Sequence, residues 1–158
     1  MKTFCKTSLI IFIILIGTII PQKDGVSQSS FVGMTQFRMQ IEESNVTLIG
    51  IVATFKDEQT CKETIRGFTH SFIEGNARAN VTGKVDAILC ANDTPPNTVW
   101  DALMYENSFS HYVLEIGGSG RIMIIEDNIR REKSLCEVFL NQMLIGKKVK
   151  GQCLPPSK

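Results

Sequence analysis

The sequence predicts an α+β domain made of two tandem ββαβ repeats, with a mainly antiparallel sheet and two helices on one face. Three observations lead to this prediction: an internal similarity at a constant offset of 75 residues, the spacing of apolar residues, and the positions of the cysteines. We expect repeat 1 over about residues 37–90, a connecting segment over residues 91–110, and repeat 2 over about residues 111–153.

The internal similarity relates residues 37–61 to residues 112–136 without a gap. Only four of the 25 aligned positions are identical, but the layout is the same. Each stretch has a short apolar strand ending in isoleucine, a polar four-residue turn, a second apolar strand, and a charged run that leads into a cysteine. A pseudo-twofold relation between the two halves would follow from a duplication.

In repeat 1, residues 37–41 alternate between apolar and polar side chains, as a half-buried strand does. Residues 42–45 are predicted to turn. Residues 46–55 are rich in β-branched side chains and predict a more central strand. The polar residues 28–34 are expected to form a frayed N-terminal segment.

A helix is predicted after Asp57, and a third strand over residues 84–90. At about 100° per residue, one narrow stripe of this helix is apolar, formed by Cys61, Ile65, Phe68 and Phe72. His70 points away from that stripe and should be exposed. Gly75 is expected to end the helix as a left-handed cap.

Repeat 2 follows the same plan, with strands at residues 112–116 and 121–125 around a glycine-rich turn. The glycines match no phosphate-binding, dinucleotide-binding or nucleophile-elbow motif, so they predict only a turn. Asp127 or Asn128 should cap a helix that ends at Gly146, before a strand over residues 147–153. Its apolar stripe is Cys136, Phe139, Leu140 and Met143.

The first 27 residues predict a secretory signal peptide. Lys2 and Lys6 precede an uncharged apolar run of 13 residues, Ser8–Ile20. Spanning a bilayer takes about 20 apolar residues, whereas a signal-peptide core needs roughly 7 to 15. We place cleavage after Ser27, which leaves residues 28–158 as a single exported domain, periplasmic or extracellular. An uncleaved leader would instead make a membrane-tethered structural protein, and an N-terminus at Gln28 would exclude it.

Export makes the four remaining cysteines candidates for two disulfides. Four cysteines allow three connectivities. Because each repeat has one cysteine at its helix start and one at the end of the following strand, we predict bonds between Cys61 and Cys90 and between Cys136 and Cys153. Free thiols or a site for a metal built from all four cysteines are the alternatives, but no CxxC pair or histidine spacing favours zinc.

After removal of the leader, 14 basic and 15 acidic residues remain, a net charge of −1. A nucleic-acid partner is therefore not expected, because such proteins have a basic surface. The basic cluster Lys147, Lys148 and Lys150 is interpreted as the solvated end of a helix.

The connecting segment has no counterpart after Cys153, so a binding surface is predicted there. The candidate binding residues are Trp100, Asp101, Tyr105 and Glu106. Thr98 and Asp101 predict a capping box for a helix of about two turns. The competing interpretation of Trp100 is structural, as a plug between the two halves.

The chain contains no recognisable catalytic motif, and no cofactor or metal is expected. The leading hypothesis is an exported, disulfide-stabilised protein without catalytic activity that binds another protein or an envelope component. The alternative is a small secreted hydrolase with a site between the repeats, using Asp101, Glu106 and His111. Three Asn-x-Thr triplets, at Asn45, Asn80 and Asn92, would accept glycans in a eukaryotic secretory route but have no meaning in a bacterial periplasm. Asn45 is expected to be a poor acceptor, because it is predicted to lie in a tight turn beside a central strand.

Overall fold

The computed structural model of the chain describes residues 30–41, 44–77, 82–117, 120–144 and 150–157. Within these ranges it forms, in order, β1 (Phe31–Ile41), β2 (Ser44–Phe55), α1 (Glu58–Ala77), β3 (Thr82–Ala91), α2 (Val99–Tyr105), β4 (Tyr112–Ile116), β5 (Gly120–Ile125), α3 (Ile129–Leu144) and β6 (Gly151–Leu154). The predicted α+β class is confirmed. The leader and Gly146 lie outside the described residues.

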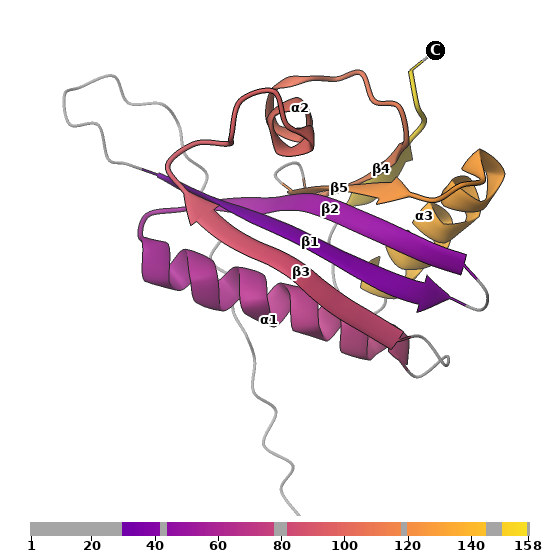
Figure 1. The fold of residues 1–158 in the computed structure, drawn as a ribbon, viewed down its shortest axis with the longest axis horizontal. Helices are drawn as coiled ribbons and strands as arrows, with labels where there is room; N and C mark the ends of the chain where they lie inside the picture. Colours follow the sequence, from indigo (N-terminus) through magenta and orange to yellow (C-terminus); the bar gives the residue numbers. More distant parts are fainter. Residues whose placement is uncertain (1–29, 42–43, 78–81, 118–119, 145–149, 158) are drawn as a thin grey trace, which may run out of the picture.

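The strands join one sheet in the order β3-β1-β2-β5-β4-β6, and every neighbouring pair is antiparallel (Figure 1). β2 and β5 pair at the centre, and each is followed outward by its hairpin partner and then by the strand that comes after a helix. The two halves therefore have the same element order, ββαβ. From the central pair, the strands of the first half extend toward one edge of the sheet and those of the second half toward the other. The duplication itself stays a prediction.

α1 and α3 pack on one face of the sheet, as predicted, over the larger of two apolar clusters. Phe72 of α1 contacts Phe37 of β1 and Phe139 of α3, with ring centroids 5.4 and 5.1 Å apart. Because Phe37 and Phe72 belong to the first half and Phe139 to the second, this aromatic group joins the halves. The described members of both predicted helix stripes lie on the buried side: Cys61, Ile65, Phe72, Cys136 and Phe139 are buried, and Phe68 and Leu140 are partly buried. The side chain of Met143 lies outside the described residues.

α2 packs on the opposite face, and Figure 1 shows it above the sheet, on the side away from α1. Its Leu103 is buried in a second apolar cluster with Val113 of β4 and Met123 of β5. Strands β1, β2, β4 and β5 all carry apolar side chains on this face, and these side chains must be shielded from water. The connecting segment, which the repeats do not share, supplies that cover.

Both predicted disulfides are present, Cys61 with Cys90 and Cys136 with Cys153, with Cα atoms 6.1 and 6.0 Å apart. The first bond ties α1 to β3, and the second ties α3 to β6. β3 and β6 are the two edge strands of the sheet. Each edge strand pairs with a neighbour on one side only, so the disulfide supplies a second attachment.

The predicted frayed segment at residues 28–34 is wrong from Phe31 onward, since β1 begins there. Val32 and Met34 are buried, and β1 pairs with β2 on one side and β3 on the other. Pairing with β2 and β3 therefore extends β1 on the N-terminal side of residues 37–41, where apolar and polar side chains alternate. The predicted turn at residues 42–45 is also shorter, because Ser44 and Asn45 belong to β2.

Gly75 does not end α1, which continues to Ala77. Among the described glycines only Gly117 has a positive φ, 61°, so Gly75 is not a left-handed cap. Its helical position leaves open space around the missing Cβ, and nothing forces the chain to turn there. Strand β6 begins at Gly151, and residues 147–149 of the predicted strand lie outside the described residues.

None of the three helices in the described ranges combines the length and apolar composition needed to cross a membrane.

Candidate functional site

Helix α2 holds three of the four predicted binding residues, and Glu106 follows as its C-cap. The predicted capping box is confirmed in part: Asp101 N donates to Thr98 Oγ1 at 3.3 Å. The Thr98 hydroxyl in turn donates to the carbonyl of Pro95 at 2.7 Å. A helix of seven residues is thus fixed at its first turn by side-chain oxygens.

Asp101 has a structural use within the segment. Its carboxylate accepts from the Asn97 backbone N–H at 3.2 Å and from the Thr94 hydroxyl at 3.3 Å. Asn97 has a φ of 60°, a left-handed conformation that asparagine tolerates better than most residues. Asp101 therefore stabilises the turn before α2, and its oxygens are occupied by the chain itself.

Tyr105, at the other end of α2, is 62% exposed, the most exposed of the large apolar side chains described. Its hydroxyl donates to Asp93 Oδ1 at 2.6 Å. The hydrogen bond from Tyr105, together with one from Thr94 N, holds the pKa of Asp93 below its ordinary value. The same bond raises the pKa of Tyr105. An exposed aromatic ring is therefore held in one orientation.

Trp100 packs against the second apolar cluster and is only partly buried. Its indole Nε1 is buried, and among the described residues it has no hydrogen-bond acceptor. Because both halves contribute residues to this cluster, the contacts fit the alternative interpretation of Trp100 as a plug between the two halves. A role of Trp100 in binding stays a prediction.

Arg121 of β5 holds the C-terminal end of α2 through hydrogen bonds from the sheet. Its Nη1 donates to the carbonyls of Leu103 and Glu106 at 3.2 and 2.9 Å, and its Nε donates to Glu115 Oε1 at 3.2 Å. A cation at the end of a helix satisfies carbonyls that have no partner within the helix. Sequence analysis missed this residue because the two helix carbonyls that it holds belong to residues more than ten positions away.

An open groove of about 460 Å³ runs beside α2, between the loop that follows it and the C-terminal tail. Ser157 N in the tail donates to the Phe109 carbonyl at 2.8 Å, and both residues line the groove. The lining combines apolar side chains with hydroxyls and one carboxylate: Val99, Ala102, Glu106, Ser108, Phe109, Ser110, Met123 and Ser157.

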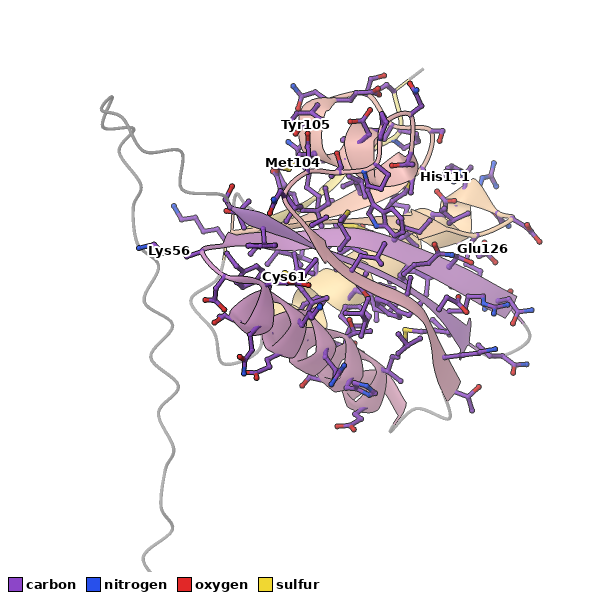
Figure 2. The ribbon with its side chains drawn as sticks, turned by 60° about the vertical axis from the view of Figure 1, so that its left-hand side comes forward. Lys56, Cys61, Met104, Tyr105, His111 and Glu126 are labelled. Atoms are coloured by element: carbon purple, nitrogen blue, oxygen red, sulfur yellow. A yellow bond between two sulfur atoms is a disulfide. The ribbon has the colours of Figure 1, made fainter. Side chains whose placement is uncertain are left out.

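His111 lies at the start of β4, and its Nδ1 is 2.6 Å from Oε1 of Glu132, a fully buried carboxylate of α3 (Figure 2 labels His111). Oε1 also accepts from Glu126 N at 3.1 Å, and Oε2 accepts from Tyr112 N at 3.2 Å. Glu132 therefore connects the start of α3 to the beginning of β4 and the end of β5.

Glu132 is the principal residue that sequence reasoning missed. A usable signal existed, because Glu132 stands four residues before Cys136 and seven before Phe139, in line with the buried stripe of α3. A carboxylate in that stripe should be buried and hydrogen-bonded.

The residues of the hydrolase hypothesis do not form one group. Asp101 and Glu106 lie at the two ends of α2, whereas His111 is held by Glu132. No hydrogen bond between described residues joins His111 to either of the other two. Within the same ranges no three histidine, cysteine or acidic side chains gather as metal ligands would.

Comparisons with known proteins identify no relative: no protein-family model, no curated protein and no solved structure matches this chain.

Proposed function

We propose that this protein is an exported, disulfide-stabilised module that binds another protein through the α2 surface, formed by Asp93, Tyr105, Glu106 and the adjoining groove. The observation that carries the proposal is Tyr105, whose ring is 62% exposed yet fixed by the hydrogen bond to Asp93. Tyrosine is enriched among the residues that contribute most to protein interfaces.

The fixed orientation of Tyr105 matters because binding normally costs about 0.5–1.5 kcal/mol for each side chain that it immobilises. The hydrogen bond to Asp93 already orders the Tyr105 side chain before a partner binds, so less of this cost remains. Beneath it, Leu103 is buried and Arg121 holds the helix end, so the α2 surface lies on a rigid support. The groove beside it offers apolar surface and the Glu106 carboxylate to the same partner.

The two disulfides support export, since such bonds persist in oxidising compartments and are rare in the cytosol. Together with the predicted leader, they favour a protein that works outside the cytoplasm, periplasmic or extracellular. A small domain that must survive there benefits from each bond, by about 3 kcal/mol.

The first experiment identifies the partner by photocrosslinking in the cells that produce the protein. Tyr105 is replaced with the photoreactive aromatic p-benzoylphenylalanine, and the same residue is placed at Val138 as a control. Val138 is 46% exposed on α3, on the opposite face of the sheet. We expect one discrete protein adduct from position 105 and none from position 138. Equal adducts at both positions would contradict the α2 surface.

The second experiment measures affinity for the crosslinked partner with purified proteins. Tyr105→Ala removes the ring and should weaken binding by about 30-fold, the level of an interface hot spot. Tyr105→Phe keeps the ring and loses only the bond to Asp93, so we expect a smaller loss. Val138→Ala should leave the affinity unchanged. If Tyr105→Ala bound as tightly as the parent protein, the site would lie elsewhere.

One observation favours a second candidate function, hydrolysis at His111. The imidazole is 32% exposed and contacts a buried carboxylate, an arrangement that orients a general base. An assay of the parent protein against ester, peptide and glycoside substrates tests this candidate. Activity that disappears in His111→Ala would support it, and an inactive parent protein would exclude it.

A further inference from the structure

Three asparagines in the chain begin an Asn-x-Thr triplet, and two of them lie in the described residues. These are Asn45 in β2 and Asn92 directly after β3; Asn80 lies outside the described residues. The triplet is the acceptor sequence for N-linked glycans in a eukaryotic secretory route. It serves only if the asparagine remains on the surface of the folded protein.

Asn45 and Asn92 are both exposed. The neighbour of Asn45 in β2, Val46, is fully buried in the cluster under α1 and α3. Successive side chains of a strand point to opposite faces, so Asn45 points away from that cluster, toward the face that carries α2. A glycan on Asn45 would therefore displace no core residue.

Among the described residues, the outer part of that face nearest to Asn45 is polar. β1 presents Gln36, Arg38 and Gln40 there, and Arg38 forms a two-pronged ion pair with Asp86 of β3, with both N–O distances 2.8 Å. A sheet face without apolar side chains needs no protein cover and can stand next to a hydrated sugar chain. Asn92 directly follows the last residue of β3. It lies at the end of the β1 and β3 pair that is farther from Asn45.

We propose that Asn45 and Asn92 are N-glycosylated when the protein passes through a eukaryotic secretory pathway. The donor is an oligosaccharide joined through a diphosphate to a polyisoprenoid lipid. The asparagine amide nitrogen attacks C1 of the first sugar and loses one proton, forming an N–C bond. The bond between C1 and the diphosphate oxygen breaks, and the lipid diphosphate leaves with the electron pair, so no oxidant or reductant is needed.

The fold also sets when the transfer at Asn92 takes place. Thr94, the third residue of that triplet, is buried, and its hydroxyl donates to Asp101. A transferase that must bind this threonine can do so only before α2 and its capping turn have formed. The glycan on Asn92 is therefore added to the unfolded chain during export.

The test uses the full-length protein expressed in cultured eukaryotic cells and collected from their secretory route. Intact mass is measured before and after treatment with peptide N-glycosidase, which removes the sugar and converts the attached asparagine to aspartate. We expect a loss of oligosaccharide mass, and aspartate at positions 45 and 92 in the proteolysed product. Asn45→Gln and Asn92→Gln should each remove one glycan from the secreted protein.

Asn141→Gln is the matched control, because Asn141 is exposed on α3 but begins no Asn-x-Thr triplet. Its glycan mass should equal that of the parent protein. The peptide measurement on the unmutated protein does not depend on the variants folding. Unconverted asparagine at both positions would overturn the proposal, and conversion at only one would overturn it for the other. The outcome is independent of whether the α2 surface binds a partner.

Discussion

At the scale of single residues, the side chains that matter most in this protein fix backbone segments rather than perform chemistry. Asp101 and Arg121 hold the two ends of α2, and Glu132 holds the start of β4. Their partners are backbone N–H and C=O groups that would otherwise lose hydrogen bonds on burial. The Asp93 and Tyr105 pair, by contrast, lies at the surface beside α2, where a partner can reach it.

Removing the charge of Asp93 should change the titration of Tyr105. The hydrogen bond to Asp93 raises the pKa of Tyr105 above its ordinary value of 10.0, so Asp93→Asn should bring it back down. The measurement is the absorbance of tyrosinate against pH, in a Tyr112→Phe background that leaves Tyr105 as the one titrating tyrosine. An unchanged midpoint would mean that the bond is absent in solution.

The same pair predicts how stability depends on pH. The pKa of Asp93 is lowered by Tyr105, so its contribution to folding is present above its ordinary value of 3.8 and is lost as the pH falls through the lower, folded value. The raised pKa of Tyr105 acts in the other direction, and its contribution is lost as the pH rises above 10.0. The urea concentration at half-unfolding should therefore differ most between the parent protein and Asp93→Asn at pH values between 3.8 and 10.0.

Glu132→Gln should destabilise the fold by about 2–4 kcal/mol. The carboxylate oxygens accept from the backbone N–H groups of Tyr112 and Glu126, and an amide NH2 in place of one oxygen would face a donor inside the protein. Glu137→Gln is the control on the same helix. Its carboxylate is exposed, 3.9 Å from Lys133, and should cost no more than about 0.5 kcal/mol. Urea unfolding of both variants checks this prediction. Similar losses would contradict the part assigned to Glu132.

At the scale of elements, the pairing of β2 with β5 joins the two halves within the sheet. Gly50 of β2 lies opposite Ile122 of β5. A Cβ at position 50 would stand 3.0 Å from Ile122 Cγ1 and 3.1 Å from the Arg121 carbonyl oxygen. The absence of a side chain at Gly50 therefore lets the central strands pair beneath the helices.

Two glycine substitutions should have opposite effects on stability. Gly50→Ala should lower the free energy of unfolding by about 1–3 kcal/mol, since the backbone oxygen cannot move without breaking the sheet. Gly67→Ala, in α1 with open space around the new Cβ, should raise it by about 0.5–1 kcal/mol. Thermal or urea unfolding compares them, and a loss in both variants would show that the contact at Gly50 is not the cause.

At the scale of the whole molecule, the sheet is built outward from β2 and β5, and its two edges are held by disulfides. The edge strand β6 has only four residues, so its bond to α3 replaces backbone pairing that a longer strand would supply. β3 is longer and contains an irregularity opposite Gln36 and Phe37. Bulges of this kind discourage pairing with further strands.

Replacing Cys136 and Cys153 together by alanine should lower the free energy of unfolding by about 3 kcal/mol, for a loop of 17 residues. Hydrogen exchange should locate the loss, with protection falling first at β6 and persisting in β2 and β5. The Cys61 and Cys90 pair closes a longer loop, of 29 residues, and its removal should cost slightly more. Equal loss of protection in all strands would contradict an edge-specific role.

Sequence by itself determined the hairpins, the buried stripes of α1 and α3, and both disulfide pairs, because each depends on the local spacing of residue types. Only the tertiary structure decided how far β1 extends, what Glu132 contacts, and that Arg121 holds α2. Those outcomes depend on neighbours brought together from distant positions, such as Glu132 with Tyr112. The predicted binding residues differ for the same reason. Trp100 and Asp101 contact other parts of the protein, while Tyr105 is left exposed because none of the described elements covers its end of α2.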